Sequence, residues 1–502
     1  MEPTQLPFIP VIIIGGGFSG LIMGAQLKRK LSFEDYVIYE RAPDIGGTWS
    51  ANKYPGCGVD IPALFYSLSF APNPDFNNFF PEQPEILAYI KATAAKFGVD
   101  KRTKLNTNWD GAVWQESTKT WTVRLSDTQT GETFTQECRV LISAKGALVN
   151  PNPCTIPGVE SFAGPVVHTA RWTPDLNLEG KDVVVIGNGC SAAQVVPAIS
   201  SDAKTVHQFS RSPQFFLPRP NPALGPVAKW IFRYVPFVQS SIRALIFHIF
   251  EYTVGQMYLS DRGERHRRRW KALSDWYVER TAPEEYWDIL KPKYLIGCKR
   301  RVFDPGYLAS LKKENVSLTN EPITRIDETG VLTESGKHYP ADVIVLATGF
   351  EMSSFNIDLV GRDGVTPKEH WAKFGGVEAY KSVACAPFPN FFFLYGPNSS
   401  TGHTSVIFAV ESVVELVLKV VRPVIKGQVT DVAVKLEYEQ EFSAVQQKAL
   451  SERVWVDCKS WYRDPETGWN GTLYPWTMYT LWRQTRWPTM DAWAFGDKIK
   501  QD

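Results

Sequence analysis

Two short apolar runs near the start of the chain flank a predicted helix. The first run, Val11–Ile14, contains only β-branched residues, and the second, Tyr36–Tyr39, is apolar and aromatic. Runs of this length and composition are typical of strands that are buried on both faces of a parallel sheet. The stretch between them, Leu21–Lys30, is predicted as a helix. The order strand, helix, strand predicts a βαβ unit.

The same pattern returns further along the chain. Asp182–Ile186 is predicted as a strand, a helix follows through about Ile199, and Thr205–Phe209 is predicted as the next strand. Ser405–Val421 carries apolar residues at helical spacing and is predicted as a core helix. Two βαβ units in one chain predict an α/β fold with two Rossmann-like dinucleotide-binding domains.

Proline-rich stretches separate these units from other parts of the chain. Asn150–Pro157 lies between the two units, and Pro213–Pro226 leads into a segment rich in helix formers and aromatic residues. Residues 223–299 are therefore predicted as a helical insertion. Their most apolar part, Trp230–Leu259, is interrupted by charged residues, whereas a membrane span needs roughly 18 consecutive apolar residues. We expect no membrane-spanning helix.

The composition narrows the class of protein. A chain of 502 residues is too long for one hydrophobic core, so two to three domains are expected. The net charge of +1 indicates neither a nucleic-acid partner nor an anionic membrane surface. The seven cysteines are odd in number and contain no C-x-x-C spacing, so no disulfide framework and no metal site are expected. These features predict a cytoplasmic protein of a reducing compartment.

The first βαβ unit carries a glycine-rich turn between its strand and its helix. Gly15, Gly17 and Gly20 form the pattern G-x-G-x-x-G, and Glu40 follows 20 residues after the last glycine. In this pattern the glycines allow a tight turn, a close approach to a pyrophosphate and close helix packing, while the acid accepts hydrogen bonds from a ribose diol. This context favours a dinucleotide site over an ordinary turn.

The second unit has the same glycine-rich turn, but a different residue follows its second strand. Gly187, Gly189 and Ala192 form G-x-G-x-x-A, and Ser191 lies inside this motif, so we expect these residues to bind a second dinucleotide. The second strand ends at Arg211 instead of an acid. An arginine can bind a 2′-phosphate that a carboxylate would repel. The second site is therefore predicted to take NADP(H) and the first FAD, with an ordinary surface arginine as the alternative for Arg211.

Two longer patterns identify a family. Phe162 to Trp172 reads F-x-G-x-x-x-H-x-x-x-W, and Gly46 to Asp60 reads G-G-x-W-x-x-x-x-Y-P-G-x-x-x-D. On these motifs the chain resembles the type I Baeyer–Villiger monooxygenases, whereas the related heteroatom-oxidising flavin monooxygenases usually carry Tyr or Phe where this chain has Trp172. Further matches to the family are Gly297–Arg300, Ala347–Phe350, Tyr395–Asn398 and Gly402–His403.

The resemblance implies an FAD- and NADPH-dependent enzyme that activates O2 as a flavin peroxide and converts a small-molecule ketone into an ester or lactone. It assigns the stabilisation of negative charge at the flavin to Arg300, because an arginine stays cationic at any working pH. It assigns the orientation of that arginine to Asp60. Lys299 matches a position that holds the NADP 2′-phosphate. Thr48 and Trp49 match positions beside the flavin, with a core aromatic as the alternative for Trp49.

The family also implies that both domains are discontinuous. The FAD domain is expected at residues 1–148 and 386–502, and the NADP domain at residues 149–222 and 300–385. The helical insertion at 223–299 interrupts the NADP domain and bears on substrate access. No feature of the sequence favours a particular oligomeric state or a particular ketone.

Three other functions compete with this interpretation. A heteroatom monooxygenase that oxidises sulfur or nitrogen is the nearest, and Trp172, Asp60 and Arg300 disfavour it. A flavin disulfide reductase would need a C-x-x-C pair, which the chain lacks. A flavoprotein without turnover is suggested only by Thr173 and Lys145, which depart from the family pattern.

Other chemistry-bearing residues receive structural interpretations. His168 lies in the connection between the domains and is expected to couple them instead of acting as a base. His403 is expected either near the flavin or as a support for its loop. The basic run Arg265–Lys271 is predicted as a solvated helix face.

Overall fold

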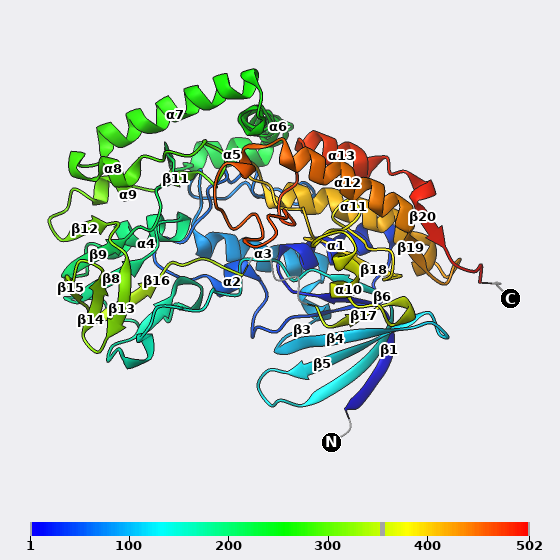
Figure 1. Ribbon diagram of the computed structural model, residues 1–502. Helices are drawn as coiled ribbons and strands as arrows, with labels where there is room; N and C mark the ends of the chain where they lie inside the picture. The colour runs from blue at the N-terminus through cyan, green and yellow to red at the C-terminus, as the bar shows by residue number, and fades with distance from the viewer. Residues whose placement is uncertain (1–2, 352–356, 500–502) are drawn as a thin grey trace.

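The computed structural model describes residues 3–351 and 357–499 and contains two large sheets, each with its own layer of helices (Figure 1). The first sheet has eight strands and the second has five. Helices from the middle of the chain, green in Figure 1, lie along the opposite edge of the molecule from the N-terminus. The predicted α/β fold with two dinucleotide-binding units is confirmed.

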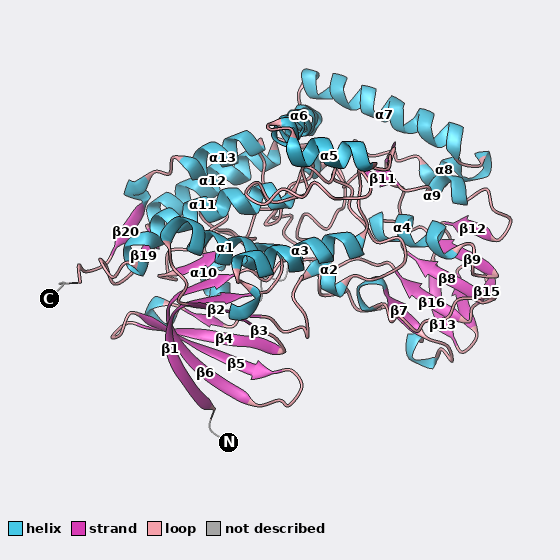
Figure 2. Ribbon diagram, turned by 180° about the vertical axis from the view of Figure 1, so that it is seen from behind, coloured by secondary structure: helices cyan, strands magenta, loops and turns pink. Residues whose placement is uncertain are grey.

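The first sheet is mixed, with the order β17-β4-β5-β6-β1-β2-β3 and with β18 paired to the end of β6. Its central strand β1 runs parallel to both β2 and β6, while β4, β5 and β6 form an antiparallel meander. Figure 2 shows the meander extending away from the rest of the molecule. The strands are β1 (Thr4–Ile14), β2 (Tyr36–Tyr39), β3 (Thr103–Lys104), β4 (Thr107–Gln115), β5 (Thr120–Asp127), β6 (Thr133–Ser143), β17 (Leu359–Val360) and β18 (Phe391–Phe393).

The second half of β1 is the apolar strand that the sequence predicts. Val11, Ile12 and Ile13 have no exposed surface, because β2 and β6 flank them and other parts of the protein cover both faces of the sheet here. The strand starts earlier than predicted, at Thr4, since its more exposed first half pairs with the start of β6. Helix α1 then follows the glycine turn directly at Phe18.

The second sheet consists of five parallel strands in the order β12-β9-β8-β16-β7. Its central strand β8 contains Val183, Val184 and Val185, which are all completely buried. A small antiparallel sheet of β13, β14 and β15 accompanies it. The strands are β7 (Val166–His168), β8 (Asp182–Ile186), β9 (Thr205–Phe209), β12 (Val316–Thr319), β16 (Val343–Leu346), β13 (Ile323–Asp327), β14 (Gly330–Thr333) and β15 (His338–Pro340).

The segment 223–299 is helical, as predicted. It contains α5 (Pro226–Tyr234), α6 (Val238–Thr253), α7 (Asp261–Thr281) and α8 (Trp287–Leu290). The short strands β10 (Phe216–Pro218) and β11 (Val302–Asp304) pair in parallel on either side of it and hold its two ends together.

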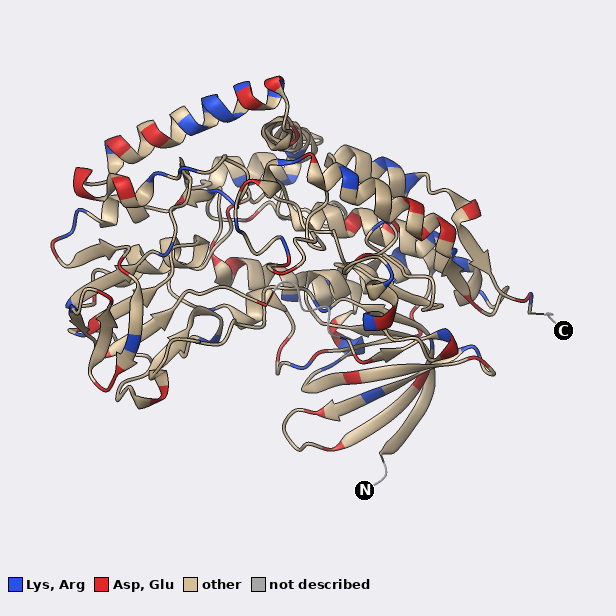
Figure 3. Cartoon of the chain, in the orientation of Figure 1, with Lys and Arg blue, Asp and Glu red and all other residues tan. Residues whose placement is uncertain are grey.

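The basic run on α7 lies mostly at the surface. Arg265, Arg268 and Arg269 are exposed, and Arg268 pairs with Glu264 one turn away at 3.1 Å. In Figure 3 this helix is coloured blue along the basic run and red toward both of its ends. Among the described residues, no helix combines the length and the apolar character that a membrane span requires.

The predicted core helix is α11, which begins after Ser405 and is buried along most of one side. It packs against α1 and α13. The other helices and the last strand pair are α1 (Phe18–Leu31), α2 (Thr48–Ala51), α3 (Gln83–Phe97), α4 (Cys190–Ile199), α9 (Tyr307–Ser310), α10 (Pro367–Ala372), α11 (Val406–Ile425), α12 (Leu436–Ser451), α13 (Met478–Arg486), β19 (Val432–Val434) and β20 (Trp493–Phe495).

The chain returns to the first sheet at β17, where Leu359 and Val360 pair with β4. The expected start of the second part of the FAD domain, residue 386, lies after this strand. We therefore propose that the return begins before Leu359. A strand of two residues has no period that the sequence would reveal.

One expectation about the cysteines is wrong. Cys298 and Cys458 form a disulfide bond across 160 residues of sequence. The expectation rested on the odd number of cysteines and on the absence of C-x-x-C spacing. Neither criterion detects two cysteines that only the tertiary fold brings together. The other five cysteines are free, namely Cys57, Cys138, Cys154, Cys190 and Cys385.

Candidate active site and dinucleotide loops

The first glycine loop is built from close backbone contacts. Gly15 has φ +113°, and a Cβ atom there would lie 2.5 Å from the carbonyl oxygen of Ala144 on the neighbouring strand end. A Cβ atom on Gly20 would lie 2.0 Å from the carbonyl oxygen of Gly15, so only glycine lets α1 approach the turn. A Cβ atom on Gly17 would lie 3.3 Å from the Cα atom of Gly47. Two glycine turns therefore meet here, at the start of α1, where the N-terminus of a helix offers N–H groups to a phosphate.

Glu40 is fixed beside this loop. Its carboxylate accepts the N–H of Gly16 at 2.7 Å and the N–H of Ala42 at 2.9 Å, and the residue is buried. Each carboxylate oxygen keeps a second lone pair. The donor set of the loop and this oriented acceptor fit the phosphate and ribose of a dinucleotide.

Thr48 and Trp49 lie on the short helix α2 that follows the second glycine turn. Gly46 donates its N–H to the carbonyl oxygen of Gly16 at 3.0 Å, which ties this turn to the first loop. Trp49 is buried, and its indole N–H donates to the hydroxyl of Tyr66 at 3.1 Å. The structure thus brings Thr48 and Trp49 next to the first loop, and Trp49 also packs in the hydrophobic core. Their contact with the flavin stays a prediction.

The second glycine loop repeats the first with one difference. Gly187 has φ +123°, and a Cβ atom there would lie 2.3 Å from the carbonyl oxygen of Ala347 on the adjacent strand end. At Gly189 a Cβ atom would meet no atom within 4 Å. The backbone at the start of α4 therefore faces open space, as a phosphate site requires. Ser191 lies in the first turn of this helix and is half-buried.

Two cations lie close together beyond the second loop. Arg211 is exposed, and Lys299 is half-buried with its Nζ 3.0 Å from the hydroxyl of Ser212. Burial lowers the pKa of Lys299, and the positive charge of Arg211 lowers it further. In the part of the chain that the structure describes, neither cation has an ion-pair partner. Two unpaired cations fit the 2′-phosphate of NADP(H).

Arg300 and Asp60 form the predicted pair. The Nε and Nη2 groups of Arg300 donate to one Asp60 oxygen at 2.9 and 2.5 Å. Both side chains are partly open to solvent, 34% exposed for the arginine and 21% for the aspartate. The carboxylate raises the pKa of Arg300 above its already high value. The guanidinium is therefore a permanent, oriented positive charge with an accessible surface.

The segment that carries Asp60 also contacts the second dinucleotide unit. The hydroxyl of Tyr54 donates to the Gln194 side chain on α4 at 2.7 Å and lies 3.4 Å from the hydroxyl of Ser191. A Cβ atom on Gly56 would lie 2.5 Å from the carbonyl oxygen of Gln194. The Y-P-G turn therefore packs along α4, and Arg300 lies where the two units meet.

Sequence reasoning missed several residues around this pair. Cys190, the first residue of α4, lies next to it, and burial together with the Asp60 charge raises the pKa of its thiol to about 11. Tyr66, Tyr395 and Tyr462 also lie near Arg300, where its charge opposes the rise in their pKa values that burial causes. These residues come from four distant segments, so no local spacing would have found them.

The residue after Arg300 has a different role. Arg301 is buried, and its Nη1 donates to the Gln256 side chain at 3.2 Å. Burial lowers its pKa to about 10, with a smaller contribution from the charge of Arg300. Of these three consecutive cations, Lys299 contacts Ser212 beyond the second loop, Arg300 contacts Asp60, and Arg301 contacts the helical insertion.

The two histidines that the sequence singled out are in structural positions. His403 Nε2 lies 2.9 Å from the Glu251 carboxylate on α6, and the imidazole is almost fully buried. This contact supports the interpretation that His403 supports its loop. His168 accepts the N–H of Ala170 through Nδ1 at 3.0 Å at the end of β7.

The arrangement limits the chemistry. It contains two glycine loops that fit dinucleotides, two cations beyond the second loop, and a fixed guanidinium where the two units meet. It offers no nucleophile with an adjacent base at Ser191, whose contact is a tyrosine hydroxyl. Transfer between two bound dinucleotides, with a negative charge stabilised by Arg300, fits this geometry.

Comparison with known proteins finds relatives over nearly the whole chain. Residues 13–82 match the family model of NAD(P)-binding Rossmann-like domains. A Baeyer–Villiger monooxygenase of Pseudomonas aeruginosa is 34% identical over 96% of this chain and 91% of its own length. One of Streptomyces coelicolor is 32% identical over 95% and 91%.

Solved structures show the same fold. A steroid monooxygenase with bound NADP is 26% identical, with a TM-score of 0.83 over 98% of this chain and all of that one. A cyclohexanone monooxygenase from Rhodococcus with bound NADP+ has a TM-score of 0.85 over 99% of this chain and 100% of that one, at 24% identity.

Proposed function

The chain belongs to the Baeyer–Villiger monooxygenase family, and from this premise we propose that Arg300 and Asp60 form its catalytic centre. The enzyme is a flavin-dependent monooxygenase that uses FAD and NADP(H). We propose a small-molecule ketone and O2 as its substrates, with an ester or lactone as the product. The observation that carries the proposal is the Arg300 guanidinium, held by Asp60 at the junction of the two dinucleotide units.

The donor sets support one cofactor for each loop. The first loop, with Gly15, Gly17, Gly20 and Glu40, would hold FAD, and Thr48 and Trp49 would lie beside it. The second loop, with Gly187, Gly189 and Ser191, would hold NADP(H), with Arg211 and Lys299 on the 2′-phosphate. When bound, NADPH supplies hydride and reduced FAD supplies the activation of O2.

Arg300 contributes a charge that does not depend on pH. An arginine remains protonated at any working pH, so it stabilises a negative oxygen without giving it a proton. Asp60 accepts two hydrogen bonds from the guanidinium and so restricts the rotation of the side chain. Such a preoriented charge lowers the energy of an anionic transition state because no reorganisation is needed during the reaction.

A turnover assay tests this proposal. The FAD-loaded enzyme, NADPH and air are combined with linear, cyclic and aryl ketones and with one thioether, and the products are identified by gas chromatography–mass spectrometry. Wild-type enzyme is expected to form esters or lactones. Arg300→Ala should lower that rate by about 10²–10³-fold, as for the loss of one oxyanion-stabilising donor, and leave the FAD content unchanged.

Arg325→Ala is the matched control, because Arg325 is an exposed arginine on β13 of the second unit. It should leave ester formation unchanged. Unaltered ester formation by Arg300→Ala would contradict the assignment of Arg300. A sulfoxide without any ester would instead place the enzyme with the heteroatom-oxidising monooxygenases.

Two further assignments remain predictions. The helical insertion at 223–299 contacts the site segments through Arg301 and His403, which supports a role in substrate access. A cytoplasmic location also remains a prediction. The Cys298–Cys458 disulfide removes the cysteine pattern as a reason for it.

A further inference from the structure

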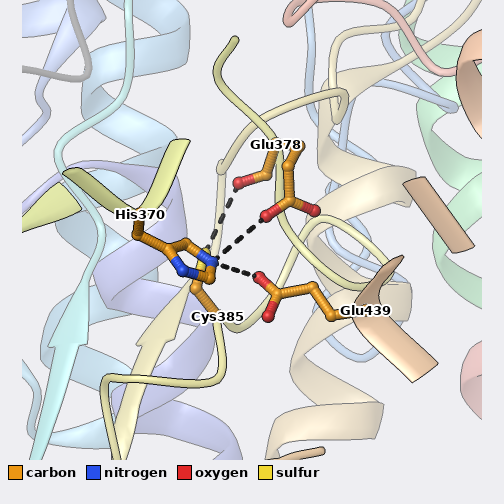
Figure 4. A group of neighbouring side chains, drawn as sticks. All are labelled: His370, Glu378, Cys385 and Glu439. Carbon is orange, nitrogen blue, oxygen red and sulfur yellow. Dashed lines mark hydrogen bonds and ion pairs between the residues drawn. The ribbon is translucent and has the colours of Figure 1, made fainter. Parts of the chain in front are cut away.

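Four side chains with metal-binding atoms meet far from Arg300 in the sequence, in the segment that returns to the first sheet. They are His370 on α10, Glu439 on α12, and Glu378 and Cys385 from the connection between α10 and β18 (Figure 4). One donor atom from each lies within 4.8 Å of all the others. All four are completely or almost completely buried, with at most 1% of each residue exposed.

The cluster contains more negative charge than its surroundings balance. His370 Nε2 lies 2.8 Å from Glu439 Oε1 and 3.6 Å from Glu378 Oε1, so a single N–H faces two carboxylates. Neither oxygen of Glu378 has a hydrogen-bond partner within the described part of the chain. No lysine or arginine among those residues pairs with either carboxylate. A buried carboxylate without a partner is costly, so the cluster is incomplete as it stands.

We propose that His370, Glu378, Cys385 and Glu439 bind one divalent transition metal, with zinc as the expected occupant. Imidazole nitrogen, thiol sulfur and carboxylate oxygen are the ligands that zinc takes, four at a time, in tetrahedral sites. Tetrahedral donors about 2.0–2.3 Å from a zinc ion lie roughly 3.3–3.8 Å apart, so the observed spacing needs only small side-chain shifts. The two carboxylates balance the charge of a divalent ion, and the Cys385 thiolate would add one further negative charge, because a thiol that coordinates zinc loses its proton.

The surroundings orient the ligands as in other metal sites, where outer hydrogen bonds hold the inner side chains. The second oxygen of Glu439 accepts the N–H of Ala386 at 2.9 Å. The indole N–H of Trp371 donates to the carbonyl oxygen of Glu378 at 2.9 Å. The thiol of Cys385 donates to the same oxygen at 3.4 Å, and metal binding would release that proton and leave the thiolate as the ligand. A capping box between Thr366 and Glu369 fixes the start of the helix that carries His370.

Four protein donors in a closed, buried position indicate a structural role for the metal and leave no place for a substrate. The ion would join α10, the connection to β18, and α12. The same connection contains Ser382, whose hydroxyl donates to the carbonyl oxygen of Asn398 at 2.9 Å. Asn398 belongs to the Y-G-P-N turn of the family motif. The metal would therefore stabilise the connection between α10 and β18, which contacts this turn through Ser382.

The main alternative occupant is a proton shared between the two carboxylates. Burial and the neighbouring Glu439 raise the pKa of Glu378, which agrees with either a proton or a metal at this place. The shared proton and the metal ion predict opposite effects of Glu378→Gln on stability. An amide removes the like-charge repulsion and stabilises a metal-free cluster, whereas it removes a ligand from a metal-bound one.

The experiment compares wild type, Glu378→Gln and Cys385→Ser, all produced in zinc-supplemented medium and passed through a metal-free desalting column. Metal content is measured by inductively coupled plasma mass spectrometry, and the melting temperature is measured with and without a chelator. Wild type is expected to hold about one zinc per chain and both variants less than about a tenth, because each loses a ligand. The variants should also melt at lower temperature than wild type.

Asp327→Asn is the matched control, because Asp327 and His338 form a partly exposed carboxylate–histidine pair at 3.1 Å in the other unit. It should keep the full zinc content. Near-stoichiometric iron or manganese that both ligand variants lose would also support the site. Folded wild-type protein with less than about a tenth of an equivalent of any such metal would overturn the proposal, and so would a higher melting temperature of Glu378→Gln. Neither readout depends on catalytic activity.

Discussion

The two glycine loops share a backbone design and differ at one position. In each, a glycine with positive φ passes within van der Waals distance of the next strand end, at Gly15 and at Gly187. At the end of the following strand the first unit has Glu40, which is buried and bonded to the loop. The second has Arg211, which is exposed and lies near Lys299.

This difference indicates that Glu40 helps to form its loop, whereas Arg211 serves only to select the ligand. Glu40 is part of the loop itself, because two backbone N–H groups depend on its carboxylate. Arg211 supports no backbone group in the described residues and adds only charge. The first site is therefore expected to lose both shape and ligand when its acid is removed, whereas the second should lose only selectivity.

Replacement of the acid in the first loop should have the largest effect. Glu40→Ala leaves the N–H groups of Gly16 and Ala42 without an acceptor, and each charge-assisted bond contributes about 1.5–3 kcal/mol. We expect FAD binding to weaken by more than about 10²-fold, seen as a loss of flavin absorbance relative to protein after gel filtration. Glu34→Ala, which removes an exposed acid at the opposite end of β2, should retain full flavin. Full flavin in Glu40→Ala would show that the glycine backbone alone holds FAD.

Replacement of the cation in the second loop should have a narrower effect. Arg211→Ala removes one charged contact of about 1.5–3 kcal/mol, so the preference for NADPH over NADH should fall by about 10- to 150-fold in kcat/KM. The kcat/KM for NADH and the FAD content should stay the same. Lys204→Ala, at an exposed lysine of the same unit, is the control. An unchanged preference would place the 2′-phosphate elsewhere.

The sequence predicted the parts of the structure that local rules determine. The strands that lead into both loops and the helix after each were predicted because a tight turn needs glycine and a buried strand needs apolar residues. The Arg300–Asp60 pair joins residues 240 apart, and only the family resemblance predicted it. Without that resemblance, Lys299 and Arg300 would be interpreted as a solvated pair of cations and Asp60 as a turn residue.

Contacts without a motif were not predictable. His370 and Glu439 lie 69 residues apart on two helices, and neither helix shows a metal-binding spacing. Strand β17 has two residues and therefore no period. Cys298 and Cys458 are brought together by the fold of the C-terminal segment. In each case the information lies in tertiary packing, which a single sequence does not display.

Removal of the Cys298–Cys458 disulfide should have the smallest effect, and that effect should concern NADPH and not FAD. Cys298 is adjacent to Lys299, so the bond tethers a cation beyond the second loop to residue 458, whereas Cys57 and Cys138 in the first unit are free. Cys458→Ser should raise the KM for NADPH only a few-fold, because the cation remains and only its restraint is lost, while FAD content stays constant. Thiol titration of the unfolded protein should count five thiols without reductant and seven with it. Seven thiols without reductant would show that the pair is reduced, and the variant should then match wild type in NADPH affinity.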